Sequence, residues 1–470
     1  MTILRARLLA ATLTVVTLST LALLFSDWRP LQILAAGAYV LFVGLSMAGA
    51  VRRDYWFVGA AMTLSLAILL VSEDPWPVLS RALLLGAYFT TFLLALNMLR
   101  DAARTSVAVR RCGNYVIAQP PGRRYVALTA AAHLFAVILN YGVINLLGTM
   151  VKRANTLASA GGDVRRFRIR EKRMMLAVLR GQCTMVGWSP LSILIALTVS
   201  LVPGLTWGAI APAGAIYSVL FLAVGWALDR IEWRAPATAA PLVASRYGFA
   251  ASVLPMFGVL AGIMVMVVGG GLLLDLPMIG AIMLMMPVFA ALWIAVQFAR
   301  LGPRLMLAMV LRRVGRWPTR EFVASRSEAL IISSAAFIGA ALAGLIPENA
   351  IEALIARADL PWLALAIALA AIVALSGQLG VNSLVMLTLI GSSLHHMAAE
   401  GLPSVLLAVA LLGGASLSIG SSPFGTPVVL VAGLTGQTPE RIGRGWNGPF
   451  TVAAFAVLCL YLAMIEWWRQ

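Results

Sequence analysis

Long apolar runs are the feature of this sequence that most limits how it can fold. Runs of roughly 17–25 residues with few or no charges recur along all of its 470 residues. The sequence is 61% hydrophobic and only 11% charged, which is more apolar surface than the core of a water-soluble protein buries. Because helices satisfy their backbone hydrogen bonds internally in a bilayer, we expect an all-α polytopic membrane protein.

The net charge of +17 is concentrated in short segments between the apolar runs. This distribution is typical of the positive-inside rule, so we expect the lipid bilayer as a partner and no nucleic acid. Arg5 and Arg7 predict a cytoplasmic N-terminus in a bacterial inner membrane. The first run shows no evident cleavage site before Asp27 and is expected to stay as a span. Alternation of the charged segments gives about eleven spans and a periplasmic C-terminus.

Two apolar stretches do not fit this alternation. Residues 125–151 lie between two basic segments, and residues 361–394 have weakly charged segments on both sides. A single crossing of residues 125–151 would place one basic segment outside. Each stretch is therefore predicted to form a re-entrant hairpin, because halves of about 13 residues are too short to cross. Their turns are expected at Asn140-Tyr141-Gly142 and at Gln378-Leu379-Gly380.

A helix-breaking motif follows each predicted hairpin. Gly187-Trp188-Ser189-Pro190 interrupts the apolar segment 174–202, and Gly420-Ser421-Ser422-Pro423 interrupts the segment 404–434. Proline lacks a backbone N–H and crowds the preceding helical turn, so both segments are expected to be discontinuous helices. Hairpin and broken helix recur about half a chain apart and enter from opposite faces, which is typical of the inverted repeats of secondary transporters.

The repeat predicts the organisation of the chain. Residues 1–30 form an extra N-terminal span, and residues 229–246 form a polar cytoplasmic linker. The first repeat covers residues 31–228 and the second covers residues 247–470. Within the second repeat, the three glycines 269–271 are expected to form a turn on the outer face.

Broken helices offer free backbone groups that a solute or ion can bind. Half-helix N-termini favour anions, and unwound carbonyl groups favour Na⁺. We place candidate Na⁺ sites near Asn140, Gly187, Gln378 and Gly420, and we expect no other cofactor. The candidate substrate-binding residues lie at the hairpin turns and the breaks: Asn140, Gly142, Asn145, Ser189, Gln378, Gly380, Asn382, Ser383, Ser421, Ser422 and Thr426.

Several of these residues have an alternative explanation. Serine and threonine in membrane helices often bond back to their own backbone or hold helices together. Arg180 could clamp an anion or extend to the cytoplasmic face beside Arg173, and the second reading is favoured. His133 could titrate near neutral pH, although a packed, hydrogen-bonded histidine is favoured. No carboxylate lies clearly at mid-membrane, which disfavours a proton relay.

The sequence contains none of the common enzyme motifs that we looked for. It contains no phosphate-binding Gly-Lys loop and no His-Glu-x-x-His zinc motif, so we do not expect an enzyme. Antiport of Na⁺ and protons, or of an inorganic ion, is a competing function. A membrane-embedded glycosyltransferase or lipid flippase is disfavoured, because it would need acidic or basic cavity residues.

From about residue 30 to the end, the chain resembles the ion transporter superfamily, which includes the divalent anion:sodium symporters and the ArsB-type and NhaB-type carriers. The resemblance lies in a hairpin and a broken helix in each half, and in Gly425-Thr426-Pro427, which matches the first part of a family signature. Val428 then replaces a polar residue, and the Ser-Asn-Thr triplet of the symporter tips is not present. The resemblance implies elevator-type transport of small, mostly anionic solutes, coupled to Na⁺ or H⁺, in a homodimer.

Overall fold

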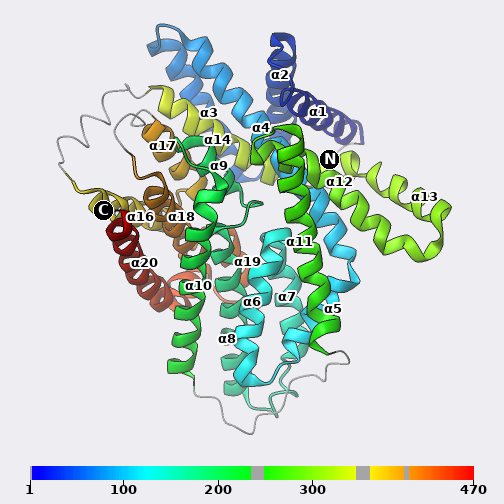
Figure 1. Cartoon of the computed structure of the whole chain (residues 1–470), viewed down its shortest axis with the longest axis vertical. Helices are drawn as coiled ribbons and strands as arrows, with labels where there is room; N and C mark the ends of the chain where they lie inside the picture. The colour runs from blue at the N-terminus through cyan, green and yellow to red at the C-terminus, as the bar shows by residue number, and fades with distance from the viewer. Residues whose placement is uncertain (1–2, 234–247, 346–359, 396–401, 470) are drawn as a thin grey trace. The chain divides into compact units, whose positions relative to one another are not determined.

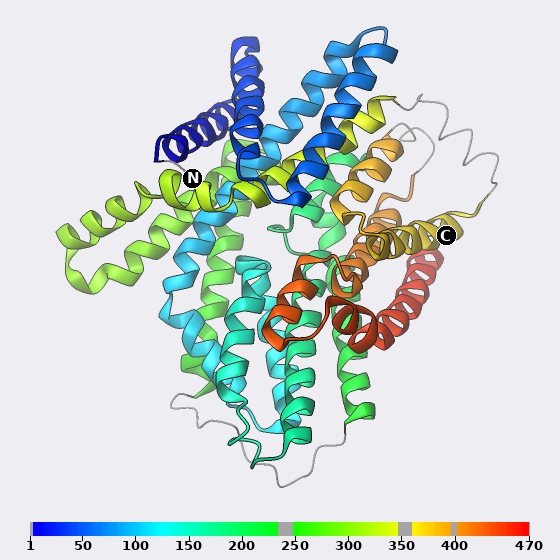
Figure 2. The same ribbon diagram turned by 180° about the vertical axis from the view of Figure 1, so that it is seen from behind.

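The computed structural model describes residues 3–233, 248–345, 360–395 and 402–469, and every regular element within them is helical (Figures 1 and 2). Eleven of these helical segments are long and apolar enough to cross a bilayer. The predicted fold class is therefore confirmed, and the chain is a multi-pass helical membrane protein. Its helices form two compact units, which are described separately below.

Unit 1 is built around α4 (Pro75–Thr105), whose side chains from Phe89 to Leu99 are all buried. Phe89 and Phe92 lie edge to face, and both are fully buried. A helix buried on all sides occupies the centre of a bundle. The helices around it are α1 (Ile3–Ala22), α2 (Arg29–Met47), α3 (Arg52–Val71), α12 (Met278–Phe298), α13 (Pro303–Val314), η3 (Trp317–Phe322) and α14 (Arg326–Leu345).

Unit 2 is centred on the second half of α8 (Val164–Thr184) and on α18 (Ser404–Ser421), which are buried almost without interruption. Around them pack α6 (Pro121–Leu139), α7 (Gly142–Ala154), η1 (Met185–Gly187), α9 (Ile193–Leu201), α10 (Trp207–Glu232), α16 (Trp362–Ser376), η4 (Gly377–Leu379), α19 (Thr426–Thr435), η5 (Arg441–Trp446) and α20 (Gly448–Arg469). Unit 2 also contains α5 (Val107–Ile117), while α11 (Phe249–Leu274) and α17 (Ser383–His395) each contribute residues to both units.

Both predicted hairpins are helix–turn–helix units in the structure. The first turns at Asn140, whose φ of +48° is a left-handed value that asparagine tolerates better than most residues. The second passes from α16 through η4 to α17 and turns at Gly380, with φ of +84°. Their re-entry on one face of a membrane remains a prediction.

Both predicted helix interruptions are also present. The first break comprises residues 185–192, where η1 and an irregular stretch separate α8 from α9. The second break comprises residues 422–425, between α18 and α19. It overlaps the predicted motif Gly420–Pro423 and continues to Gly425. Proline and glycine therefore end both helices where their backbone properties predict.

The membrane-crossing segments equal the predicted number but differ at one place. Residues Trp362–Leu379 are long and apolar enough to cross, although they form the first arm of the predicted hairpin 361–394. Residues 174–202, predicted as a discontinuous helix that crosses, are divided by the first break as expected, but neither α8 nor α9 is among the helices long and apolar enough to cross. The expected outside turn at residues 269–271 is wrong, because α11 continues through these glycines to Leu274, and the turn falls at Asp275, with φ of +51°.

The predicted linker 229–246 is only partly described. Its first residues continue α10 as far as Glu232, and residues 234–246 lie outside the described residues. The proposed boundary between the repeats stays a prediction. Two helices were not predicted at all, α5 and α13, because their arginine-rich, amphipathic sequences do not read as apolar runs.

Candidate functional site

In unit 2 the first arm of each hairpin packs closely on the helix that leads into a break. Gly181 of α8 leaves no room for a Cβ atom beside the carbonyl oxygen of Thr129 in α6. Gly414 of α18 has the same relation to the carbonyl oxygen of Ala370 in α16. A missing side chain thus lets helix backbones approach at corresponding places in both halves. The inverted repeat itself stays a prediction.

The first break is held by α10. Gly214 of α10 faces the carbonyl group of Gly187 so closely that no side chain fits between them. The Ser218 hydroxyl, one turn later, donates to the carbonyl oxygen of Thr184 at 2.8 Å. The indole of Trp207 donates to the carbonyl oxygen of Trp188 at 2.9 Å. Backbone oxygens released at the break are therefore bonded or closely covered by protein.

His133 of α6 is fixed in its neutral form beside this break. The indole Nε1–H of Trp188 donates to Nε2 of His133 at 2.8 Å. An indole can only donate, so Nε2 accepts and the ring proton lies on Nδ1, 3.0 Å from the hydroxyl of Thr184. His133 is 8% exposed. The packed, hydrogen-bonded histidine favoured from the sequence is confirmed.

The second break binds the turn of the second hairpin. The side-chain amide of Gln378 donates to the hydroxyl of Ser421 at 2.8 Å, and the hydroxyl of Ser422 donates to the carbonyl oxygen of Gly377 at 2.6 Å. Arg444 of η5 donates to the side-chain oxygen and to the carbonyl oxygen of Gln378, both at 3.0 Å. Three residues, Ser421, Ser422 and Arg444, thus hold one hairpin turn.

Ser383 and Asn382 continue this contact into α17. The hydroxyl of Ser383 lies 3.1 Å from that of Ser418 in α18, and both side chains are buried. Asn382 is exposed, and its side-chain oxygen accepts from the backbone N–H of Leu384, which caps the start of the helix. Gly380, with its left-handed φ, is exposed beside Phe424.

A buried arginine joins the two broken helices. Arg180 of α8 is 4% exposed and donates from Nε to the side-chain oxygen of Asn447 at 2.9 Å. The amide of Asn447 in turn donates to the carbonyl oxygen of Gly420, at the end of α18, at 2.9 Å. Arg180 also donates to the hydroxyl of Tyr125 at 3.0 Å and lies over the ring of Phe450.

This position contradicts the favoured reading of Arg180. A side chain that reached the cytoplasmic face would be exposed, whereas the guanidinium group is enclosed by α6, α10 and α20. Arg173, two turns earlier on the same face of α8, is paired with Asp229 at 2.7 Å instead. Within the described ranges, no carboxylate forms an ion pair with Arg180 (residues 3–233, 248–345, 360–395 and 402–469).

Other predicted site residues do not join this network. Asn140 is half-buried and Gly142 and Asn145 are exposed at the first hairpin turn, and no hydrogen bond among described residues links Asn140 to Gln378. Ser189 is fully buried, and its hydroxyl has no hydrogen-bond partner among the described residues. Thr426 begins α19 and is half-buried. The role of each of these residues in binding stays a prediction.

The candidate Na⁺ sites fit only in part. At the second break, the carbonyl oxygens of Gly377 and Gly420 already accept hydrogen bonds from protein. The carbonyl of Gly187 is closed off by Gly214. The buried hydroxyl of Ser189 is the oxygen that an ion could recruit, but one ligand does not define a sodium site.

Three contributors were missed by sequence reasoning: Arg444, Asn447 and Ser418. In the sequence, Arg444 is one of many arginines between apolar runs, and nothing beside it indicates a contact with the hairpin turn. A polar residue at the start of the last apolar run was the available signal for Asn447, and a serine three residues before Ser421 was the signal for Ser418.

No protein-family model matches this chain, and no curated protein matches it either. Among solved structures it is similar to the YdaH transporter of Alcanivorax borkumensis, whose topology is described as unusual. The two share 13% identity, the match covers 88% of this chain and 99% of that one, and the TM-score is 0.49. A TM-score at this level carries no argument about function.

Proposed function

We propose that this protein is a secondary transporter of small anionic organic solutes in the bacterial inner membrane, of the kind found in the ion transporter superfamily. The substrate would bind where the two broken helices meet in unit 2. Coupling to Na⁺ or H⁺, a homodimeric assembly, and a cytoplasmic N-terminus with a periplasmic C-terminus are parts of the same proposal.

The burial of Arg180 without an ion pair among the described residues is the observation that supports this proposal. Burying an unpaired cation in an apolar environment costs several kcal/mol, so such residues are rarely kept without a role. Here the guanidinium group has only neutral partners among the described residues, and through Asn447 it contacts the end of the other broken helix. A carboxylate-bearing solute would supply the missing negative charge, with bidentate geometry that suits arginine.

Arg444 adds a second positive charge at the second hairpin turn. The hydrogen-bonded partners of Arg180, Arg444 and Gln378 are neutral or basic within the described residues. A site for bare cations would be expected to present carboxylates, so this composition favours an anion over the alternative of cation/proton antiport.

Uptake by the purified protein in liposomes tests the function directly. We expect at least one compound from a panel of radiolabelled carboxylates to accumulate when a Na⁺ or pH gradient is imposed. Exchange of Na⁺ for protons without any organic solute would instead establish the antiporter. Failure of every carboxylate under both gradients would reject the proposal.

Two substitutions separate the role of Arg180 in binding substrate from its contribution to the fold. Arg180→Lys keeps the charge, whereas Arg180→Gln keeps a polar but shorter side chain without the charge. We expect Arg180→Gln to lose uptake and Arg180→Lys to retain part of it, with both variants monodisperse in detergent. The matched control is Arg81→Gln, at an exposed arginine of α4. Wild-type uptake by Arg180→Gln would contradict the assignment.

A further inference from the structure

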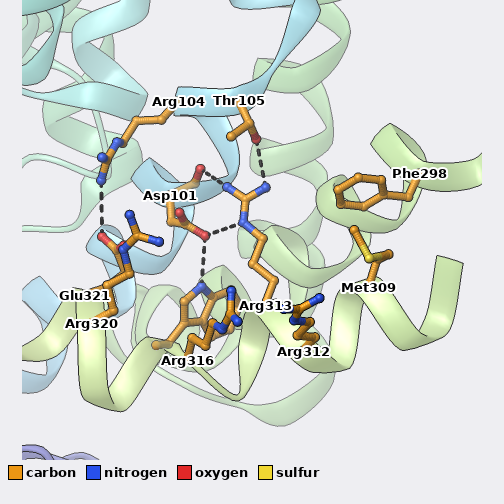
Figure 3. A pocket seen from close by; sticks show the side chains of 11 residues that line it. Asp101, Arg104, Thr105, Phe298, Met309, Arg312, Arg313, Arg316, Arg320 and Glu321 are labelled. Atoms are coloured by element: carbon orange, nitrogen blue, oxygen red, sulfur yellow. Dashed lines mark hydrogen bonds and ion pairs between the residues drawn. The ribbon is translucent and has the colours of Figure 1, made fainter. Parts of the chain in front are cut away.

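A pocket of about 400 Å³ lies in unit 1, and none of the residues that line it takes part in the proposed function (Figure 3). The ends of α4 and α12 form its walls together with α13 and η3. Phe298 and Met309 give it an apolar side. Its polar lining is dominated by five arginines: Arg104, Arg312, Arg313, Arg316 and Arg320.

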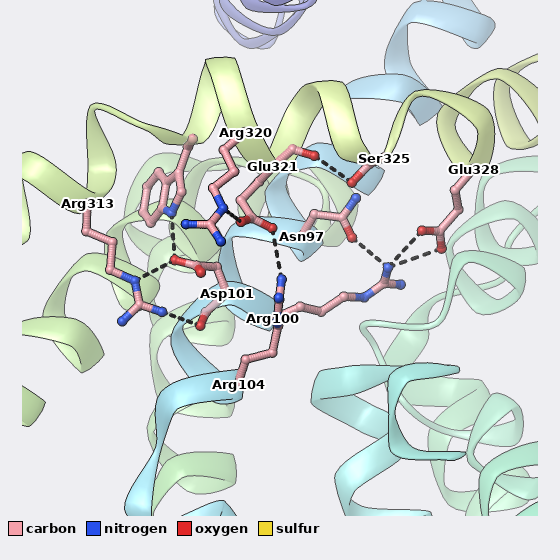
Figure 4. Close-up of polar contacts among 10 residues, drawn as sticks. Asn97, Arg100, Asp101, Arg104, Arg313, Arg320, Glu321, Ser325 and Glu328 are labelled. Carbon is pink, nitrogen blue, oxygen red and sulfur yellow. Dashed lines mark hydrogen bonds and ion pairs between the residues drawn. The ribbon is translucent and has the colours of Figure 1, made fainter. Parts of the chain in front are cut away.

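Two carboxylates offset part of this charge. Asp101 accepts from Nε of Arg313 at 2.7 Å and from the indole of Trp317 at 3.2 Å (Figure 4). Glu321 lies 3.4 Å from Arg104. Burial is the main effect that raises the pKa of Glu321, and the charge of Asp101 raises it further while the nearby arginines lower it.

Arg312 and Arg316 remain available at this pocket. Both side chains are exposed, and neither forms an ion pair within the part of the chain that the structure describes. Five arginines against two carboxylates leave the lining with a formal charge of 5 − 2 = +3. The pocket is therefore complementary to a multiply oxygenated anion, and guanidinium groups bind phosphate in a bidentate manner.

The neighbouring helix α13 indicates that such an anion belongs to the membrane. It has no buried residue, and Leu305, Leu307 and Leu311 are each more than half exposed, at 60%, 55% and 62%. Its 12 residues span about 18 Å, too short to cross a bilayer core of roughly 30 Å. It packs against α12, which is long and apolar enough to cross. An exposed helix with leucines and arginines beside a span suits the membrane–water interface.

We propose that this pocket binds the phosphate headgroup of an anionic phospholipid. Arg312 and Arg316 hold the phosphate, while Phe298, Met309 and the leucines of α13 contact the acyl chains. Basic pockets between membrane helices on the cytoplasmic side recognise such headgroups, and each nearby arginine adds about 1 kcal/mol of attraction, or roughly fivefold in affinity. This lipid site is independent of the proposed transport site.

Titration of fluorescent phosphatidylglycerol into the full-length protein in neutral detergent tests the site. We expect Arg312→Gln with Arg316→Gln to bind roughly 25-fold more weakly than the wild type. The control pair is Arg7→Gln with Arg52→Gln, which removes two exposed arginines of unit 1 that do not line the pocket. Size-exclusion chromatography verifies that both pairs stay folded.

Four outcomes would overturn the proposal. Unchanged binding by the Arg312/Arg316 pair, or equal weakening by the control pair, would reduce the effect to general surface charge. Full competition by inorganic phosphate alone would make soluble phosphate the ligand. Equal binding of fluorescent phosphatidylcholine would show that the headgroup charge is not recognised.

Discussion

At the scale of single residues, Arg444 is the clearest case of a side chain whose partners set its role. It is exposed, yet its guanidinium group donates twice to Gln378 at the second hairpin turn. Only three residues away, Arg441 is equally exposed and lies at the start of the same short helix η5. The pair offers a test in which charge and location are nearly constant.

We expect Arg444→Ala to lower uptake at least tenfold, because the Gln378 side chain loses the donor that orients it, and a hydrogen bond to a charged group contributes about 1.5–3 kcal/mol. Arg441→Ala should leave uptake within twofold of the wild type. Initial rates in proteoliposomes at matched protein density provide the measurement. If both variants behave alike, the contact with Gln378 does not support the site.

At the scale of helices, the first break depends on the contact between α10 and η1. Gly214 allows this contact because it carries no side chain where the carbonyl group of Gly187 lies. Gly208, near the start of α10, has open space around it. The two glycines therefore separate the effect of crowding from the effect of helix propensity.

Gly214→Ala should reduce the free energy of unfolding by about 1–3 kcal/mol, because a methyl group would push α10 away from the break. Gly208→Ala should be neutral or slightly stabilising, since alanine favours the helix. Thermal unfolding of the detergent-solubilised variants provides the comparison. An unchanged melting temperature for Gly214→Ala would show that the break adapts without α10.

Local sequence rules predicted most helices but not all of them. The turn at Asn140 and the break before Pro190 follow from backbone preferences that each residue carries alone. The three glycines at 269–271 wrongly predicted a turn, because α11 continues through them and the leucines that follow. Amphipathic α13 was missed because hydropathy detects spans and not helices lying at an interface.

The candidate site was less predictable than the fold, because its bonds join distant parts of the sequence. Gln378 and Ser421 were predicted and do form a hydrogen bond. The burial of Arg180 depends on Asn447, and no local pattern reveals a partner so far along the chain. Asn140 was predicted with equal reasoning, yet no described hydrogen bond connects it to the breaks.

At the scale of the whole molecule, the division into two units bears on the proposed elevator mechanism. Both hairpin turns and both breaks lie in unit 2, whereas α1–α4 and α12–α14 lie in unit 1. An elevator requires one such unit to carry the bound solute while the other stays fixed. Movement of unit 2 is a prediction that accessibility measurements can test.

We expect Ser422→Cys, at the second break, to react with a membrane-impermeant thiol reagent from either side, depending on whether substrate and gradient are present. The background replaces Cys112, Cys183 and Cys459 with alanine. Arg81→Cys, exposed in unit 1, should react from one side in every condition. Labelling of Ser422→Cys from a single side throughout would exclude alternating exposure of the break.

The bridge from Arg180 to Asn447 also has a consequence for biogenesis. Its two residues are 267 positions apart, so the guanidinium group enters the membrane long before the translating ribosome delivers its amide partner. Until the last helix inserts, Arg180 lacks this bond, and unit 2 retains a polar defect that chaperones and membrane proteases can recognise. Completion of the bridge would therefore mark the point at which the newly made protein becomes resistant to degradation.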